Sequence, residues 1–212
     1  MDCCQCKGVE SIFNEREANK KLKSYRKSGP AKTTSLLIEA LKAEGVQGKT
    51  LLDIGGGVGV IQHELLRAGV ESATDVDASR AYIKAAQAEA TRQGHADRVS
   101  YHYANFVDYA PQVQPAGIVT LDRVICCYHD MPSLVGRSVE KAGALYGLVY
   151  PRDAWWMRLA NFLANRFWQI TRNPFRAYVH RTTAVDTLVR NSGFQRRFHK
   201  KAGVWQVVVY AR

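Results

Sequence analysis

Hydrophobic residues follow two alternating patterns along the first 150 residues. Short apolar runs alternate with segments whose apolar side chains return every three to four residues. The first pattern predicts buried strands and the second predicts helices. Together they predict an α/β fold with a mostly parallel sheet and helices on both faces. Strands are expected at about 50–54, 71–76, 98–104, 117–121 and 144–149. Helices are expected from a cap at Thr33, Thr34 or Ser35 to Gly45, from Gly59 to Gly69, from a cap at Ser79 to Arg92, and at about 132–141.

The last third of the chain has a different order of elements. A long helix is expected over 153–171, and Asn173-Pro174 ends it. Thr183-x-x-Asp186 resembles a capping box and predicts a further helix that Gly193 closes. Strands at 194–200 and 204–210, joined by a tight turn, predict an antiparallel hairpin at the sheet's edge. The apolar face of the long helix is Trp155, Leu159, Leu163, Phe167 and Ile170.

We expect residues 1–31 to form an irregular or loosely helical basic arm and residues 32–212 to form one domain. An insertion at about 151–180 is expected to cover a substrate site. The chain has no run of 18 apolar residues, and residues 1–10 lack the apolar core of a signal peptide. These features predict a cytoplasmic protein.

Charge is distributed unevenly along the chain. The net charge is +4 over residues 1–50, −3 over 51–150 and +10 over 151–212. A basic C-terminal third could attract an anionic small molecule, a nucleic acid or a membrane surface. A solvated basic face explains the same charge, so the partner stays open.

The five cysteines do not indicate a disulfide framework, because their number is odd and they form two tight clusters. Cys3-x-x-Cys6 is one half of a zinc-knuckle pattern without its second half. We therefore assign no metal site and expect Cys3, Cys4 and Cys6 to be free thiols. Cys126 and Cys127 are expected to be small core residues.

A glycine-rich motif, Asp53-x-Gly55-x-Gly57-x-Gly59, lies between an expected strand and an expected helix. Glycines allow a sharp turn and close approach of a ligand, and the helix N-terminus favours a negative group. Asp77 ends the next strand, where a carboxylate can accept both hydroxyls of a ribose. The dinucleotide fingerprint G-x-G-x-x-G fails, because its third glycine would be Val60 or Gln62.

The motif resembles motif I of the class I methyltransferases that use S-adenosylmethionine (SAM), and the resemblance extends over about 48–150 and the hairpin at 194–210. It implies a Rossmann-like sheet and SAM as the cofactor. Asp77, rather than Asp75, would be the ribose-binding acid, and Asn105 would hold the adenine amine. The cofactor-binding residues implied are Asp53, Gly55, Gly56, Gly57, Gly59, Asp77, Ala78, Asn105, Phe106, Asp122 and Arg123.

Residues on the acceptor side are less well defined by the sequence. His129 and His180 are candidate general bases. Aromatic residues beside arginines in the insertion would suit a flat, partly anionic acceptor. The same aromatics would also be explained by packing of the long helix onto the domain, or by its resting on a membrane surface. The candidate acceptor-binding residues are Tyr128, Arg152, Trp155 and Arg176.

The resulting hypothesis is a SAM-dependent methyltransferase that transfers a methyl group in line to the oxygen or carbon of a small acceptor. An RNA methyltransferase, a non-catalytic SAM-binding protein and a nicotinamide-dependent oxidoreductase remain as alternatives. The sequence does not indicate an oligomeric state.

Overall fold

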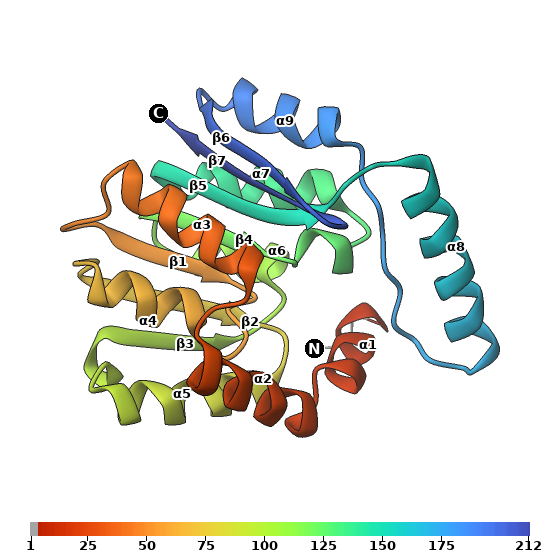
Figure 1. Ribbon diagram of the computed structural model, residues 1–212, viewed down its shortest axis with the longest axis horizontal. Helices are drawn as coiled ribbons and strands as arrows, with labels where there is room; N and C mark the ends of the chain where they lie inside the picture. Colours follow the sequence, from red (N-terminus) through yellow and green to blue (C-terminus); the bar gives the residue numbers. More distant parts are fainter. Residues whose placement is uncertain (1–3) are drawn as a thin grey trace.

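The computed structural model describes residues 4–212, with side chains from residue 8 onward. A seven-stranded sheet has the order β3-β2-β1-β4-β5-β7-β6 (Figure 1). Strands β1 to β5 pair in parallel, and β7 is antiparallel to both β5 and β6. The predicted Rossmann-like class, with its C-terminal hairpin, is therefore confirmed. The strands are β1 Thr50–Ile54, β2 Ser72–Asp77, β3 Val99–Tyr103, β4 Ala116–Asp122, β5 Ala142–Pro151, β6 Gln195–Ala202 and β7 Trp205–Ala211.

Helices connect the strands and extend the chain at its N-terminal end (Figure 1). Three short 3-10 turns are η1 Ala96–Arg98, η2 Ala110–Gln112 and η3 Ile125–Cys127. The α-helices are α1 Cys4–Ile12, α2 Glu15–Ser28, α3 Lys32–Ala43, α4 Val60–Arg67, α5 Arg80–Gln93, α6 Phe106–Tyr109, α7 Met131–Glu140, α8 Trp155–Ile170 and α9 Thr182–Asn191.

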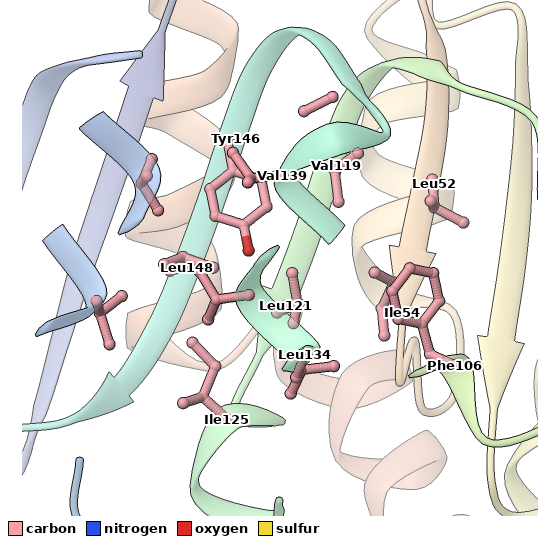
Figure 2. Close-up of a cluster of buried hydrophobic side chains, with 14 of the residues drawn as sticks. Leu52, Ile54, Phe106, Val119, Leu121, Ile125, Leu134, Val139, Tyr146 and Leu148 are labelled. Atoms are coloured by element: carbon pink, nitrogen blue, oxygen red, sulfur yellow. The ribbon is translucent and has the colours of Figure 1, made fainter. Parts of the chain in front are cut away.

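The two faces of the sheet carry separate hydrophobic cores, because side chains alternate along each strand. Leu52 and Ile54 of β1 belong to the core beneath α7 and α9, which also holds the fully buried Tyr146 (Figure 2). Leu51 points to the other face, into the core that α3 and α4 cover with Leu37 and other side chains. The two cores hold the sheet between its helices and so position the carboxyl ends of the strands, where the candidate functional residues lie.

The N-terminal segment is not an irregular arm. Residues 4–28 form α1 and α2, and α2 packs on α5. Leu22 and Tyr25 are buried with Tyr82 in a third hydrophobic cluster. Arg26 also pairs with the buried Glu89 at 2.7 Å. The segment is thus held against the domain by both packing and charge.

Helix caps were predicted correctly at one position and wrongly at two. Ser79 caps α5, since its hydroxyl accepts the N–H of Tyr82 at 3.2 Å. Helix α3 begins at Lys32, so the predicted capping residues 33–35 lie inside its first turn. The capping box at 183–186 is absent, because α9 begins at Thr182, whose N–H donates to Asp153 Oδ2 at 3.1 Å. Asp186 instead accepts a hydrogen bond from Tyr210. Thr34 donates to Asp122 and Asp186 accepts from Tyr210, so at both helices a bond to a distant residue replaces the predicted capping bond.

The predicted long helix exists as α8, but its apolar face does not pack on the domain. Trp155 and Ile170 are 77% and 79% exposed. The expectation that these side chains pack the helix onto the domain is therefore wrong. No helix in the described part of the chain is long and apolar enough to cross a membrane.

Candidate functional site

A cavity of about 500 Å³ lies at the carboxyl ends of the central strands. In an open parallel sheet this edge is where ligands bind. The size is within the range of sites for small organic ligands. Predicted cofactor residues that line the cavity are Asp53, Gly55, Gly56, Gly57, Asp77, Ala78, Asn105, Phe106, Asp122 and Arg123; Gly59, which starts α4, is the one predicted residue outside the lining.

The loop after β1 requires glycine for two different reasons. Gly57 has a φ of 62°, a conformation that glycine adopts without strain. A Cβ at Gly56 would lie 2.3 Å from Gln62 Nε2 and 2.8 Å from the carboxylates of Asp53 and Asp75. The loop backbone therefore rests directly on buried polar side chains, and a larger residue at position 56 would lift it.

Two of those side chains support the loop from below. Asp53 accepts hydrogen bonds from the Thr120 hydroxyl at 2.7 Å and from Gln62 Nε2 at 3.2 Å. Burial raises the pKa of Asp53 to about 7. Asp75 accepts the N–H of Gly56 at 3.2 Å, and burial raises its pKa as well. Asp75 is absent from the cavity lining.

Asp77 is the carboxylate that faces the cavity. It accepts the N–H of Gly57 at 3.1 Å and the N–H of Ser79 at 2.7 Å. Burial raises the pKa of Asp77 to about 6, although these backbone bonds favour its charged form. The ring of Tyr82 lies beside Gly57, and its buried hydroxyl has no hydrogen-bond partner in the described part of the chain. A ligand in the cavity would find an acceptor in Asp77 and an unused donor in Tyr82.

Asn105 and Phe106 form the cavity wall after β3. Asn105 caps the short helix α6, and its amide donates to Asp108 at 2.8 Å and to the Tyr128 hydroxyl at 3.2 Å. Phe106 is buried and belongs to the core shown in Figure 2. The amide of Asn105 is thus held in place by its own neighbours.

A charged cluster follows β4. Arg123 Nε donates to Asp122 at 2.9 Å, and the Thr34 hydroxyl donates to the same carboxylate at 2.5 Å. Arg123 also donates to Thr34 at 2.9 Å. Lys21 of α2 borders the cavity here, and burial, together with repulsion from Arg123, lowers its pKa. Two cations and one anion leave this end of the cavity positive.

Several residues of the cavity lining were not identified by the sequence analysis. Phe13 lies with its ring centroid 5.5 Å from that of Tyr82 and 6.1 Å from that of Phe175. These residues come from segments far apart in the chain, and no motif marks them. The missed lining residues include Val9, Ile12, Phe13, Lys21, Thr34, Tyr82, Phe175, Ala177 and Trp205.

Tyr128 lines the cavity, as predicted for an acceptor-binding residue, but neither predicted base does. His129 is exposed and its ring stacks on that of Tyr128, with the two ring centroids 5.5 Å apart. His180 Nε2 lies 2.9 Å from the Tyr128 carbonyl and 3.1 Å from the Ile125 carbonyl, so it donates to the backbone, and burial lowers its pKa. No histidine lines the cavity among the residues whose side chains are described.

The other three predicted acceptor residues also lie outside the lining. Arg176 donates to the carbonyls of Asn173 and Phe175, both at 2.6 Å. Arg152 donates to the Gly203 carbonyl at 3.3 Å, and Trp155 lies on the exposed face of α8. Two of these side chains therefore stabilise loops.

Cys126 and Cys127 both border the cavity, and Cys126 is buried. A hydrogen bond with Cys127 and burial raise the pKa of Cys126, which keeps it a thiol. Cys3 lies outside the described residues, and the side chains of Cys4 and Cys6 do too. Within the described residues no three histidine, cysteine or acidic side chains are grouped as metal ligands.

Comparison with known proteins finds a family that is similar to part of the chain. A family model described as the methyltransferase small domain matches residues 24–120. This range contains the glycine loop, Asp77 and Asn105. Over this part of its length, a little under half, the chain resembles the class I SAM-dependent methyltransferases.

Proteins related to this chain include ribosomal protein L11 methyltransferases. Those of Aliivibrio fischeri (strain MJ11) and Vibrio parahaemolyticus are each 31% identical, over 125 and 127 residues. The matches cover 59% and 60% of this chain but only 38% and 39% of the relatives. The chain thus spans about two fifths of the length of these relatives.

Solved structures share the fold of this chain at low sequence identity. Magnesium protoporphyrin IX methyltransferase from Synechocystis PCC 6803, with bound S-adenosylhomocysteine, has a TM-score of 0.75 at 16% identity and covers 98% of this chain and 99% of its own. An O-methyltransferase family protein from Burkholderia thailandensis has a TM-score of 0.70 at 16% identity, over 96% of this chain and 62% of its own.

Proposed function

We propose that the protein binds SAM in the cavity at the carboxyl edge of the sheet and transfers its methyl group to a small, flat or anionic acceptor. The observation that carries the proposal is Asp77, a buried carboxylate tied to the Gly57 and Ser79 amides and facing the cavity. The match to the methyltransferase small domain supports SAM as the ligand.

The residues that line the cavity offer a partner for each part of SAM. Asp77 would accept the ribose hydroxyls, and the Gly55–Gly57 backbone would lie against the ribose and methionine portion. Asn105 and Phe106 would border the adenine. Lys21 and Arg123 make the end of the cavity after β4 positive and would attract the methionine carboxylate.

Bound SAM supplies a sulfonium methyl group that a nucleophile can displace in line. The protein's main contribution would be positioning, which can lower a barrier by up to about 7–11 kcal/mol in favourable cases. Phe13 and Phe175 would exclude water from one side of the cavity. With Tyr128 and Trp205 they give the lining flat aromatic surfaces beside the two cations. This combination favours a flat acceptor with negative charge, methylated at oxygen or carbon.

A protein acceptor is the second candidate, because the relatives are named as methyltransferases of ribosomal protein L11. The family model matches residues 24–120, which include the glycine loop, Asp77 and Asn105. The C-terminal third, residues 151–212, lies outside this match and carries a net charge of +10. Such a surface would suit an acidic patch or nucleic acid on a macromolecular acceptor.

Calorimetric titration with SAM, S-adenosylhomocysteine and NADH tests the first part of the proposal. We expect micromolar binding of the first two and none of NADH. Release of S-adenosylhomocysteine is then measured with a panel of aromatic hydroxy acids and, in parallel, with ribosomal protein. NADH binding without SAM binding would contradict the proposal, and turnover with the protein acceptor alone would favour the second candidate.

A further inference from the structure

Helix α8 presents its apolar side chains to solvent. Six of them are between 53% and 79% exposed, and Trp156 is 41% exposed. Elsewhere in the described residues only Val204 is a large hydrophobic with a similarly exposed side chain. Figure 1 shows α8 at one side of the molecule, beyond the coil that follows it. The six residues, which we call the apolar stripe, are Trp155, Leu159, Phe162, Leu163, Phe167 and Ile170.

Hydrogen bonds and one aromatic contact on the inward face of α8 fix the helix in this orientation. Asn161 Nδ2 and Asn165 Nδ2 donate to the Ala177 carbonyl at 2.9 and 2.8 Å. The Ala177 N–H donates back to Asn165 Oδ1 at 3.0 Å. The rings of Trp168 and Phe175 pack edge to face, with their centroids 5.0 Å apart. The helix cannot roll its apolar stripe inward without breaking these contacts.

The segment that contains the apolar stripe is positively charged. Residues 154–185 contain five arginines and no acidic residue. Arg158 and Arg166 lie on α8 itself and are exposed. The nearest carboxylate is that of Asp153, 3.7 Å from Arg158. Arg158 lies at the edge of the apolar stripe, and Arg166, four residues from both Phe162 and Ile170, lies within it. An exposed apolar helix face with arginines, whose long side chains can reach the headgroups, is the pattern of a helix at the surface of an anionic membrane.

We propose that α8 docks on an anionic lipid surface, with its axis in the plane of the membrane and the apolar stripe inserted among the lipid headgroups. Its 16 residues would span roughly 24 Å of that surface. Pairing of two copies through this face is disfavoured, because it would bring arginines together with no acidic partner between 154 and 185. The proposal does not depend on the methyltransferase activity.

Docking would leave one helix diameter, about 10 Å, between the lipid and one wall of the cavity. Ala177, which α8 holds through both asparagines, lines the cavity, and so does Phe175. An amphiphilic acceptor dissolved in the membrane would therefore meet the protein near the site.

Vesicle sedimentation of the full chain, without SAM, tests the proposal. The vesicles contain phosphatidylcholine alone or phosphatidylcholine with phosphatidylglycerol. We expect binding to the anionic vesicles only, and a blue shift of tryptophan emission on binding. In a double variant, Leu159→Gln with Leu163→Gln, the affinity should fall at least about tenfold. In Arg158→Gln with Arg166→Gln it should fall similarly, and added salt should weaken wild-type binding.

Two matched controls lie on the C-terminal hairpin. Val204→Gln removes an exposed apolar side chain outside α8, and Arg197→Gln with Lys200→Gln removes two exposed charges. Both should change the affinity by less than about twofold. The α8 substitutions are at exposed positions, so the melting temperature should be retained.

Three results would overturn the proposal. The first is no binding of the wild type to anionic vesicles at low salt. The second is binding that the Leu159→Gln/Leu163→Gln variant retains within twofold. The third is a dimer in lipid-free buffer that the same variant dissociates, since the stripe would then be an interface between copies of this chain.

Discussion

Replacing Asp77 with asparagine tests the assignment of the ribose-binding acid most directly. The substitution keeps the shape of the side chain and one acceptor oxygen but removes the charge that faces the cavity. Asp77 holds the Gly57 N–H at 3.1 Å and the Ser79 N–H at 2.7 Å, and its remaining acceptor capacity would serve the ribose hydroxyls. A hydrogen bond to a charged group contributes about 1.5–3 kcal/mol, so the dissociation constant of SAM should rise about 10- to 150-fold.

Calorimetry at two pH values sharpens the test. Because burial raises the pKa of Asp77 to about 6, the carboxylate is charged at about pH 8 and mostly neutral at about pH 5. The difference in affinity between wild type and variant should therefore be large at the higher pH and small at the lower one. Asp75→Asn is the matched control: burial already favours the neutral form of Asp75, and this residue does not line the cavity. Its affinity for SAM should stay within about threefold of wild type.

The reasoning would be refuted by a folded Asp77→Asn protein that binds SAM within twofold of wild type at about pH 8. It would also be refuted if Asp75→Asn had the larger effect. Circular dichroism and the melting temperature of each variant establish that the loop variants are folded before their affinities are compared.

Three further predictions concern the same end of the sheet. Gly56→Ala should weaken SAM binding at least about tenfold and lower the melting temperature, because its Cβ would lie 2.3 Å from Gln62 Nε2; unchanged calorimetry would contradict this. Thr34→Val removes the hydroxyl between Asp122 and Arg123 and should cost about 1–2 kcal/mol in urea denaturation; a loss below about 0.3 kcal/mol would show that the bridge contributes little. Burial raises the pKa of Asp53 to about 7 from 3.8, so the neutral carboxyl stabilises the folded protein at low pH and this contribution is lost as the pH rises between these two values. Between about pH 5 and pH 8 the free energy of unfolding of the wild type should therefore fall, relative to that of Asp53→Asn, by of the order of 2 kcal/mol. A difference between the two proteins that does not change with pH would exclude this titration.

Local patterns predicted the cofactor side of the fold well. A strand followed by glycines and a helix is a short-range arrangement, so its residues lie in space much as they do in sequence. The position of Ser79 after β2 predicted a cap for the same reason, and the cap is present. Asp77 lines the cavity because it ends β2 beside that loop.

The rest of the cavity could not be predicted because it depends on how distant segments pack. Phe13 and Phe175 meet at 6.1 Å although 161 positions separate them in the chain. Thr34 was expected to cap a helix, but its hydroxyl binds Asp122, 88 residues away. Helix α8 was predicted with the correct apolar residues, yet two asparagines anchor its polar face inward. Periodicity identifies a face but not the side of the molecule to which it turns.

The backbone of Arg123 has a consequence for engineering. Its φ of 63° lies in the left-handed region, which costs a residue with a Cβ roughly 1–2 kcal/mol. Glycine would remove that strain, but it would also remove the guanidinium that holds Asp122 and lines the cavity. A screen for thermal stability alone would weigh the relieved strain against the lost hydrogen bonds to Asp122 and Thr34, and it would not detect the lost contact with a ligand. Stability and ligand recognition place different demands on this residue, so a stabilised version of the protein should be selected with ligand present.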